Sequence, residues 1–367
     1  MASKVYFADF RADLHENLQQ KLTRLMKTAG MGDIDFNRKF VAVKMHFGEP
    51  GNLAFLRPNW AKTVADFIKE RGGMPFLTDC NTLYVGGRKN GLLHLDTAYM
   101  NGFSPLSTGC HVIIADGIKG LDETYVPVRG GEYVKEAKIG KAIMDADIVV
   151  SLTHFKGHES TGFGGTLKNL GMGSGSRAGK MEQHKSGKPH VEQELCVGCG
   201  MCGKICAHDA PHIINGKSAI DHDKCVGCGR CIAVCPRDAI VNDNDSSNRI
   251  LNCKIAEYSK AVVDGRPHFH ISLVIDVSPN CDCHSENDAA IVPNVGMFAS
   301  FDPVALDVAC ADAVNAQPVI RNSMAGAGDG SDRDHFHLVH PDTRGLDCIE
   351  HAEKIGLGSS EYELIKI

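Results

Sequence analysis

Short apolar runs alternate with longer amphipathic stretches over most of this chain. The apolar runs are rich in Val, Ile and Phe and end in polar or Gly-rich turns, which predicts buried strands. These strands are expected at 5–10, 40–47, 74–79, 111–116, 146–155, 268–277 and 295–300. Apolar residues at helical spacing predict helices near 13–28, 58–71, 88–101, 132–145, 251–263 and 303–315. This alternation predicts an α/β fold in which helices cover both faces of a mostly parallel sheet.

Single residues predict two helix boundaries. Pro58 stands where a helix would begin, and Gly72 and Gly73 follow its expected end. Asp302 precedes Pro303 at the start of another predicted helix. Because a carboxylate at that position accepts hydrogen bonds from the first helical turn, we expect Asp302 to be an N-cap rather than a catalytic acid.

A cysteine-dense segment interrupts the alternation. It is flanked by polar stretches and contains two runs of four cysteines with the same spacing, Cys-x2-Cys-x2-Cys-x3-Cys. This repeat, found within one short segment, indicates an insertion into a larger domain. We therefore expect an α/β domain in two parts, 1–187 and 246–367, with the insertion at 188–245.

The cysteine spacing matches that of bacterial ferredoxins with two [4Fe-4S] clusters. Three thiolates of one run bind one cluster, and the fourth cysteine of that run ligates the other cluster. The expected sets are Cys196, Cys199, Cys202 and Cys235 for cluster 1, and Cys225, Cys228, Cys231 and Cys206 for cluster 2. Two structural zinc sites are the alternative. A zinc site takes four ligands in two pairs, and the two runs of four cysteines are not divided into such pairs. A three-iron cluster would need a missing cysteine, and none is missing.

Composition and charge exclude several classes of partner. At 367 residues the chain is long enough for two or three domains, and its net charge of −6 argues against nucleic acid. It has no apolar run of about 18 residues to span a membrane, and its charged N-terminus has no apolar signal core. Fifteen cysteines without such a signal indicate metal ligands in a reducing cytoplasm, and low-potential clusters indicate an anaerobe. Since no G-x-G-x-x-G follows a strand, a bound nicotinamide or flavin is not supported.

Polar side chains gather where the predicted strands end. In mostly parallel sheets, ligands bind beyond the carboxyl ends of the strands, so we expect these residues to share one site. The set comprises Lys44, His46, Glu49, Asp79, Cys80, Asn81, Asp116, His154, Lys156, His158, Asp276, Cys281, Cys283 and His284. The alternative explanation is that loops collect polar residues in general.

The segment after His154 is rich in glycine and carries three candidate catalytic residues, Lys156, His158 and Lys168. Glycines let the backbone approach a ligand closely, and lysine ammonium groups attract anions. We therefore expect these three side chains to bind or protonate an anionic substrate.

The stretch GSGSRAGKM at 173–181 resembles a phosphate-binding loop only superficially. Ser174 replaces its first glycine, and Met181 stands where Ser or Thr is required, so an ATPase is excluded. Two interpretations remain: a flexible, anion-binding loop that uses Arg177 and Lys180, or a solvated linker to the insertion.

Cys281, Cys283 and His284 form a compact set of soft ligands. Three interpretations compete: a further metal or cluster site, redox-active or nucleophilic thiols, or plain loop cysteines. Closely spaced Cys and His in a reducing compartment favour metal, for which Cys80 could supply a third thiolate. We expect Cys281 and Cys283 either to bind the second redox centre or to attack substrate.

Other cysteines and histidines carry weaker signals. Small buried side chains are the expectation for Cys110, Cys253, Cys310 and Cys348. The segment from His335 to His337 alternates like a strand, which would place both histidines on one face. A metal site there, with His340, is the less favoured interpretation, because histidine pairs are commonly surface or hydrogen-bonded residues.

The chain resembles the family called domain of unknown function 362, in its subgroup with an inserted ferredoxin-like module. The resemblance covers nearly the whole chain. It rests on VKMHFGEPGN (43–52), FLTDCNTLY (76–84), IADG (114–117), HFKGHESTGFGGTLKNLGMG (154–173), the eight-cysteine insertion, CDCH (281–284) and ASFDPVALDVAC (299–310). It implies two [4Fe-4S] clusters in the insertion and an α/β main domain, and it implies no settled reaction.

Together these features predict a cytoplasmic iron–sulfur protein whose two clusters exchange electrons with a site in the α/β domain. Its partner would be a ferredoxin- or flavodoxin-type protein or a small, anionic substrate, with no role for nucleic acid or membrane. An oxidoreductase is the main expectation. The alternatives are a non-enzymatic electron carrier or redox sensor, and a protein that delivers metal or clusters.

Overall fold

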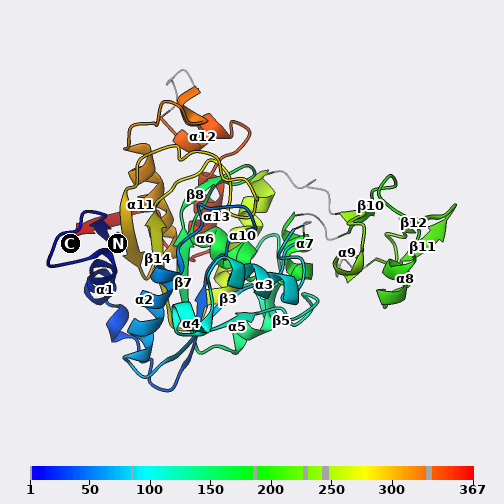
Figure 1. Ribbon diagram of the computed structural model, residues 1–367, viewed down its shortest axis with the longest axis horizontal. Helices are drawn as coiled ribbons and strands as arrows, with labels where there is room; N and C mark the ends of the chain where they lie inside the picture. Colours follow the sequence, from blue (N-terminus) through cyan, green and yellow to red (C-terminus); the bar gives the residue numbers. More distant parts are fainter. Residues whose placement is uncertain (1, 84–85, 185–187, 226–229, 242–247, 328–332) are drawn as a thin grey trace.

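The computed structural model describes residues 2–83, 86–184, 188–225, 230–241, 248–327 and 333–367. A large sheet forms the centre of an α/β body, and a cysteine-rich part projects from one side of it (Figure 1). The described residues of that part, within 188–241, are called the cysteine module below. None of the described helices combines the length and the apolar character that crossing a bilayer requires.

The main sheet has eight strands in the order β16-β1-β15-β14-β7-β2-β3-β4. The strands are β1 (Ser3–Asp9), β2 (Phe40–Lys44), β3 (Met74–Asp79), β4 (His111–Ile114), β7 (Ile148–His154), β14 (His268–Val274), β15 (Gly296–Ser300) and β16 (Tyr362–Lys366). Strand β15 runs antiparallel to β1 and β14, whereas the other pairs are parallel. The mostly parallel sheet is thus confirmed, and the pairing of β1 with β16 brings both ends of the chain side by side (Figure 1).

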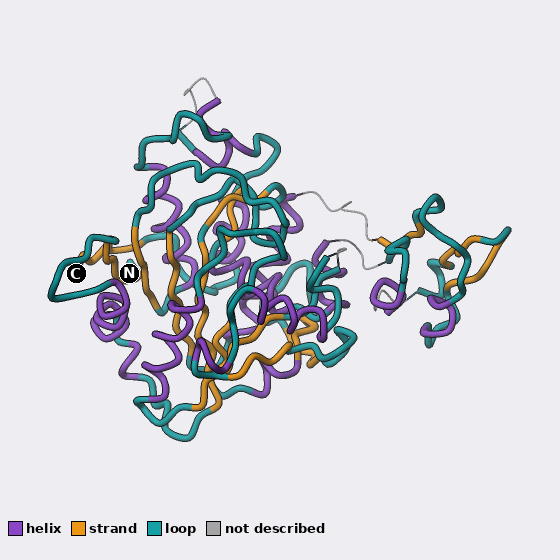
Figure 2. Tube along the Cα trace, in the orientation of Figure 1, coloured by secondary structure: helices purple, strands orange, loops and turns teal. Residues whose placement is uncertain are grey.

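Helices cover both faces of this sheet (Figure 2). One face is covered by α1 (Leu18–Thr28), α2 (Pro58–Lys69) and α3 (Gly91–Met100), and the other by α6 (Thr166–Ser174), α10 (Asn248–Val263), α11 (Pro303–Asn315) and α13 (Leu346–Lys354). Val41 and Val43 of β2 join the first core, while Ala42 joins the core on the opposite face. Burial on both faces explains why the strands appear in the sequence as continuous apolar runs.

Both predicted helix boundaries are confirmed. Pro58 is the first residue of α2, and Gly72 follows that helix in the left-handed region with φ of 79°. Asp302 caps α11, since its carboxylate accepts hydrogen bonds from the backbone N–H groups of Val304 and Ala305 at 2.8 and 3.1 Å.

The helix predicted near 132–145 is wrong. The chain forms a hairpin of β5 (Glu123–Pro127) and β6 (Glu136–Gly140) and then a short helix, α5 (Lys141–Asp145). Ala137 and Ile139 are both buried and lie two residues apart, whereas Glu136 is exposed. This is the period of a strand, and it extends over too few positions to stand out in the sequence.

The Gly-rich stretch 173–181 is neither a flexible loop nor a solvated linker. It forms the end of α6 and the start of α7 (Arg177–His184), and both Arg177 and Lys180 are buried. Its glycines allow close packing: a Cβ atom on Gly179 would lie 2.3 Å from the carbonyl oxygen of Lys138. The low side-chain volume therefore serves contact between segments and not flexibility.

The strand-like alternation from His335 to His337 is also wrong. These residues form α12 (His335–Val339), and Asp334 caps its first turn. The ring of His335 bonds the carbonyl oxygen of Gln317 at 2.9 Å, and that of His340 bonds Pro279 at 2.8 Å. The structure thus gives His335 and His340 hydrogen-bonding roles.

The cysteine module is built from small elements. They are α8 (Met201–Ile205), α9 (Arg230–Val234), β10 (His190–Val191) paired with β13 (Ile240–Val241), and β11 (Pro211–Ile214) paired with β12 (Lys217–Ile220). In both halves of the module, the last cysteine of the run is followed by the same hydrogen-bonded turn. The N–H of Ala210 bonds the sulfur of Cys206 at 3.4 Å, and the N–H of Ala239 bonds that of Cys235 at 3.2 Å.

Candidate functional site

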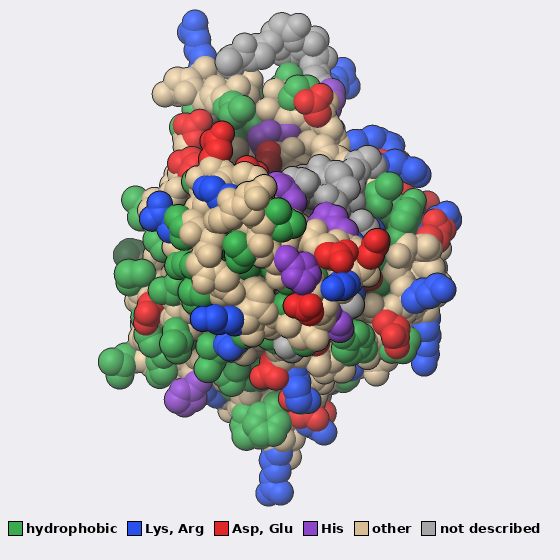
Figure 3. Space-filling view, turned by 90° about the vertical axis from the view of Figure 1, so that its right-hand side faces the viewer, with side chains coloured by type: hydrophobic (Ala, Val, Ile, Leu, Met, Phe, Trp, Pro, Cys, Tyr) green, Lys and Arg blue, Asp and Glu red, His purple; other side chains and the backbone are tan. Residues whose placement is uncertain are grey.

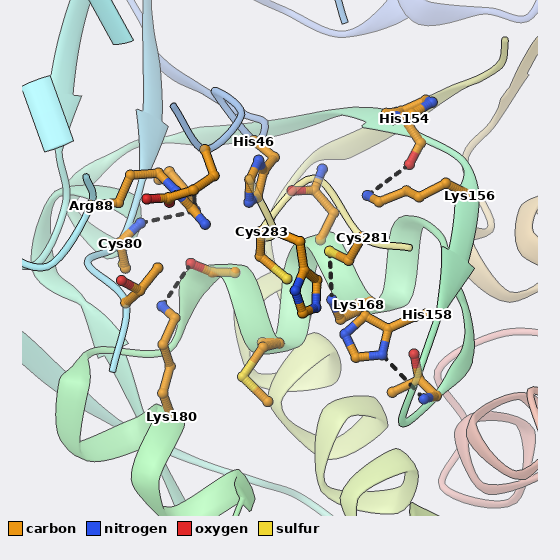
Figure 4. Close-up of a pocket in the computed structure, with 18 of the residues that line it drawn as sticks. His46, Cys80, Arg88, His154, Lys156, His158, Lys168, Lys180, Cys281 and Cys283 are labelled. Atoms are coloured by element: carbon orange, nitrogen blue, oxygen red, sulfur yellow. Dashed lines mark hydrogen bonds and ion pairs between the residues drawn. The ribbon is translucent and has the colours of Figure 1, made fainter. Parts of the chain in front are cut away.

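The carboxyl ends of β2, β3 and β7 and the loop after β14 surround one cavity of about 670 Å³ (Figure 4). A cavity of this size accommodates a small organic ligand. Most of the predicted strand-end residues line it, namely Lys44, His46, Glu49, Asp79, Cys80, His154, Lys156, His158, Cys281, Cys283 and His284. The strand-end residues thus lie at the edge of the sheet that bears this cavity.

Three residues of the predicted set do not line the cavity. The side-chain amide of Asn81 donates to the carboxylate of Asp116 at 2.8 Å, and both residues are fully buried. Asp276 is partly exposed and lies 3.9 Å from the guanidinium of Arg57. The roles of Asn81 and Asp116 in the described structure are therefore internal.

A tight turn presents Cys281 and Cys283 to the cavity. The N–H of His284 bonds the carbonyl oxygen of Cys281 at 3.0 Å, which closes the turn. Between the cysteines, the buried carboxylate of Asp282 bonds Nδ1 of His154 at 2.8 Å and lies 3.6 Å from the ammonium of Lys156. Asp282 therefore anchors the turn to the end of β7, and both thiols face the space beyond it (Figure 4).

The two thiols differ in electrostatic character. The hydrogen bond from Cys283 and the nearby Lys168 and Lys156 ammonium groups hold the pKa of Cys281 well below its usual value, although burial opposes this. The same hydrogen bond, together with burial, raises the pKa of Cys283 well above its usual value. Cys281 is therefore the more acidic thiol of the pair.

Lys168 lies directly beside this thiol. Its Nζ atom donates to the sulfur of Cys281 at 3.2 Å (Figure 4). Burial alone would lower the pKa of Lys168, but the negative charge of Cys281 raises it instead. The expected role in binding a substrate anion is therefore modified, because the counter-ion of Lys168 is a residue of the chain itself.

The predicted anion binder Lys156 is likewise held internally. Its ammonium donates to the carbonyl oxygen of His154 at 3.0 Å and lies near Asp282. Two further cations of the wall are paired: Lys44 with Asp79 at 2.9 Å, and Arg88 with Glu49 at 2.7 Å. These ion pairs give the wall fixed charges of both signs.

Lys180 and His46 retain binding capacity toward the cavity. The Lys180 ammonium donates to the carbonyl oxygen of Gly175 at 2.6 Å, and none of the described carboxylates forms an ion pair with it. Nδ1 of His46 accepts the N–H of Gly48 at 2.9 Å, so Nε2 carries the proton, and this buried Nε2 has no partner among the residues that the structure describes. An unpaired cation and an unsatisfied N–H donor in one cavity wall favour an anionic ligand.

The predicted ligand set of Cys281, Cys283 and His284 is split in two by the structure. His158, Cys281 and Cys283 bring one ligand atom each to within 4.8 Å of one another, as do Glu159, Cys283 and His284. His284 bonds Glu159 at 3.0 Å. Cys80, considered as a third thiolate, lines the same cavity but belongs to neither group, and its thiol donates to the carbonyl oxygen of Ser174 at 3.3 Å.

His158 is a poor metal ligand in this arrangement. Its Nδ1 accepts the N–H groups of Ser160 and Thr161 at 3.0 and 3.3 Å. Burial lowers the pKa of His158 to about 4, so the ring is neutral and Nε2 carries its proton. Neither ring nitrogen therefore offers a free lone pair, and a metal ion would have to displace these backbone hydrogen bonds.

The sequence did not single out several residues of the wall. Arg88, Glu159, Asn169 and His184 also line the cavity. For Glu159 a signal existed, since it directly follows His158 within the Gly-rich segment. Arg88 gave none, because its partners Glu49 and Asp79 precede it in separate segments that only the fold brings together.

Four of the predicted cluster ligands lie together in the cysteine module. One small cavity is lined by Cys196, Cys199, Cys202 and Cys235. The N–H of Ser218 bonds the sulfur of Cys196 at 3.3 Å. Four cysteines around one space, with backbone N–H groups directed at their sulfurs, fit an iron–sulfur cluster. Of the other predicted set, Cys228 lies outside the described residues.

The module packs against the wall of the large cavity. Lys89 donates to the carbonyl oxygen of Cys235 at 3.0 Å and forms an ion pair with Asp238. Leu83, which also lines the cavity, and Met181 of α7 share an apolar cluster with Ile232 and other module residues. On the side of the molecule from which the module projects, Lys and Arg side chains are interspersed with Asp, Glu and His (Figure 3).

Comparison with known proteins identifies a family and a distant relative. Residues 41–312 match the family described as "Domain of unknown function (DUF362)". The thylakoid-associated protein sll1697 of Synechocystis sp. is 29% identical over 157 residues, which are 40% of this chain and 43% of that protein. The chain therefore spans less than half of that relative's length.

Two solved structures resemble the chain weakly. The lactate racemase apoprotein from Thermoanaerobacterium thermosaccharolyticum gives a TM-score of 0.36 at 12% identity, over 78% of this chain and 54% of that one. A structural-genomics target from Thermotoga maritima gives a TM-score of 0.38 at 13% identity, over 81% of this chain and 58% of that one. The chain thus covers little more than half of each.

Proposed function

This chain belongs to the DUF362 family, whose description assigns no reaction, and from its residues we propose that it is a cytoplasmic iron–sulfur oxidoreductase. Two [4Fe-4S] clusters in the cysteine module transfer electrons to or from the cavity at the sheet edge. The observation that carries the proposal is that Cys235, from the second cysteine run, lines one small cavity with three cysteines of the first run. This crossing of the fourth ligand is the arrangement of two-cluster ferredoxins.

The clusters would be held by the two crossed cysteine sets. Cluster 1 takes Cys196, Cys199, Cys202 and Cys235, and cluster 2 takes Cys225, Cys228, Cys231 and Cys206. When bound, such clusters supply one-electron transfer at low potential. The backbone N–H groups of Ser218 and Ala239 stabilise thiolate charge on Cys196 and Cys235, which raises the potential relative to unbonded sulfurs.

The residues of the large cavity have separable roles in this proposal. Cys281 is the reactive thiolate, Cys283 its hydrogen-bonded partner, and Lys168 stabilises the negative charge. Lys180 and the free N–H of His46 bind the charged group of a small anionic substrate. Lys156 holds the turn through Asp282. His158, neutral and buried, would donate a hydrogen bond from Nε2 to the substrate and would not act as an acid at neutral pH.

An enzyme is favoured over a simple electron carrier because of the cavity itself. A simple carrier does not need a cavity of about 670 Å³ whose wall contains a buried lysine with no ion pair among the described carboxylates. In an enzyme, a ferredoxin- or flavodoxin-type protein would exchange electrons with the module. The carrier and the metal-delivery protein remain the alternatives, and the latter requires a labile metal at Cys281 and Cys283.

A further metal at Cys281, Cys283 and His284 is the part of the prediction that the geometry supports least. The two sulfurs and a ring nitrogen are close enough to hold an ion. However, the hydrogen bonds of His158 occupy its lone pair, and Lys168 already neutralises Cys281. The thiols are therefore better suited to react than to ligate.

Metal analysis of protein purified without oxygen tests the cluster proposal. We expect about eight irons and eight sulfides per chain and a reduced-state EPR signal of interacting clusters. Cys235→Ser should lose about half of the iron, whereas the control Cys110→Ser, which alters a buried cysteine of the α/β body, should retain it. Zinc in place of iron would contradict the proposal.

A further inference from the structure

The two sulfurs at the cavity lie on one short turn. Cys281 begins the turn and Cys283 is its third residue, and the hydrogen bond from the N–H of His284 closes it. The sulfurs lie within 4.8 Å of each other. A disulfide needs about 2.05 Å, so rotation of the two side chains, without a change of fold, could bring the sulfurs into bonding distance.

The backbone of the turn is held in place by hydrogen bonds on two sides. The buried Asp282 carboxylate bonds His154, and the N–H of Glu49 bonds the carbonyl oxygen of Asp282 at 2.9 Å. The backbone between the cysteines is therefore fixed on two sides. A fixed backbone with adjacent sulfurs favours reaction within the pair over reaction with a distant thiol.

The surroundings suit a thiol pair that changes its oxidation state. Lys168 supplies a positive charge at Cys281, which stabilises the thiolate released when a disulfide opens. The cavity gives a small molecule access to the sulfurs, while Cys80 in the same wall bonds Ser174 and stands apart from the pair. No other described cysteine belongs to the ligand groups around Cys281 and Cys283.

From this arrangement we propose that Cys281 and Cys283 form a reversible dithiol–disulfide couple that stores two electrons at the cavity. In the reducing direction the S–S bond breaks, two electrons enter, Cys281 leaves as a thiolate beside Lys168, and Cys283 takes up one proton from solvent. In the oxidising direction the couple passes two electrons and one proton to a disulfide acceptor, such as oxidised dithiothreitol, which opens to a thiol and a thiolate. The reductant is a pair of one-electron iron–sulfur donors, and a small dithiol can replace it in vitro.

The source of the electrons rests on the proposed function, whereas the couple itself does not. The experiment therefore follows the thiols directly. Full-length protein, purified without oxygen, is equilibrated in buffers of reduced and oxidised dithiothreitol that span a range of potentials. Free thiols are then alkylated, and peptide mass spectrometry with fragmentation distinguishes Cys281 and Cys283 from Cys310. Iron is measured on the same samples.

The expected result is a single two-electron transition in which Cys281 and Cys283 lose their reactivity together and regain it on reduction. Cys281→Ser and Cys283→Ser should each abolish the transition, and Cys80→Ser should leave it unchanged. Thiols that stay reduced at every potential, a disulfide to Cys80, or a stoichiometric metal released only when the pair is alkylated would each overturn the inference. If the protein contains its full complement of iron but shows no transition, the couple is rejected and the cluster proposal stands. If the transition occurs in protein without iron, the couple stands and the cluster proposal is rejected.

Discussion

The ammonium of Lys89 donates a hydrogen bond to the carbonyl oxygen of Cys235 at 3.0 Å. This bond links the residue next to Arg88, in the wall of the large cavity, to a predicted ligand of cluster 1. Asp238 of the module forms an ion pair with the same ammonium. The contact thus joins the two parts of the chain between which electrons are proposed to pass.

Reversing the charge of Lys89 should weaken this contact. In Lys89→Glu, two carboxylates face each other, and we expect a loss of about 1 kcal/mol of docking free energy, a change of about fivefold. Hydrogen exchange of the amides of α7, which packs on the module through Met181, should accelerate accordingly. The double variant Lys89→Glu/Asp238→Lys should restore the exchange rates. If it does not, the ion pair has no part in docking.

Removing the charge of Lys168 should make Cys281 less reactive. In Lys168→Met the pKa of Cys281 is expected to rise, because its thiolate loses the neighbouring ammonium. We expect the pH at which alkylation of Cys281 by iodoacetamide is half-maximal to rise with that pKa, by about one pH unit for each pKa unit. The control Lys62→Met alters a surface lysine paired with Asp66. Equal alkylation rates in both variants would exclude Lys168 as the stabilising charge.

Loss of Lys180 should weaken the binding of anions. Its buried ammonium bonds backbone carbonyls and has no ion pair among the described carboxylates, so a bound anion would be its counter-ion. We expect Lys180→Met to raise the Kd for inorganic phosphate or a small carboxylate about tenfold or more in calorimetry. Lys204→Met, in the module, should not change it. A Kd unaffected by Lys180→Met would place the anion elsewhere.

The buried pair of Glu257 and His351 should make stability depend on pH. Hydrogen bonds to Cys253 and to Glu257, the latter at 2.8 Å, raise the pKa of His351 to about 9. Since the raised pKa belongs to the folded state, the stabilisation is complete below about pH 6.5, the unfolded value, and disappears as the pH rises through about 9.

Urea unfolding between pH 6 and pH 9.5 measures this effect. We expect a loss of about 1–2 kcal/mol across that range, after allowance for screening by water. His351→Gln should be less stable at pH 6 and should show a flatter pH profile. A wild-type profile that is flat above pH 6.5 would contradict the assignment.

The sequence predicted the sheet better than it predicted the segments around it. Runs such as 40–47 and 268–277 are apolar because both faces of their strands are buried, and this property is local. The segment containing Arg177 and Lys180 was expected to be a loop because it is rich in Gly and Ser. Its glycines in fact serve contacts with distant residues, as Gly179 does with Lys138, and no local pattern records such contacts.

The sequence predicted which residues line the candidate cavity better than it predicted how those residues interact. Strand ends identified most of the lining residues, because the carboxyl ends of parallel strands meet at one edge. The state of each side chain depended on partners far away in the sequence. Lys168 is paired with Cys281, 113 residues later, and Asp282 with His154, 128 residues earlier. Which lysines are free to bind substrate therefore could not be deduced from spacing.

The anchoring of Asp282 gives the two sides of the cavity different mechanical properties. Its bonds to His154 and Lys156 make the thiol-bearing turn and the end of β7 one rigid unit. The opposite side includes Leu83 and α7, which bear directly on the module. A displacement of the module would therefore move one wall while the sulfurs stay in place. The volume open to a ligand would then change while the position of the thiols does not.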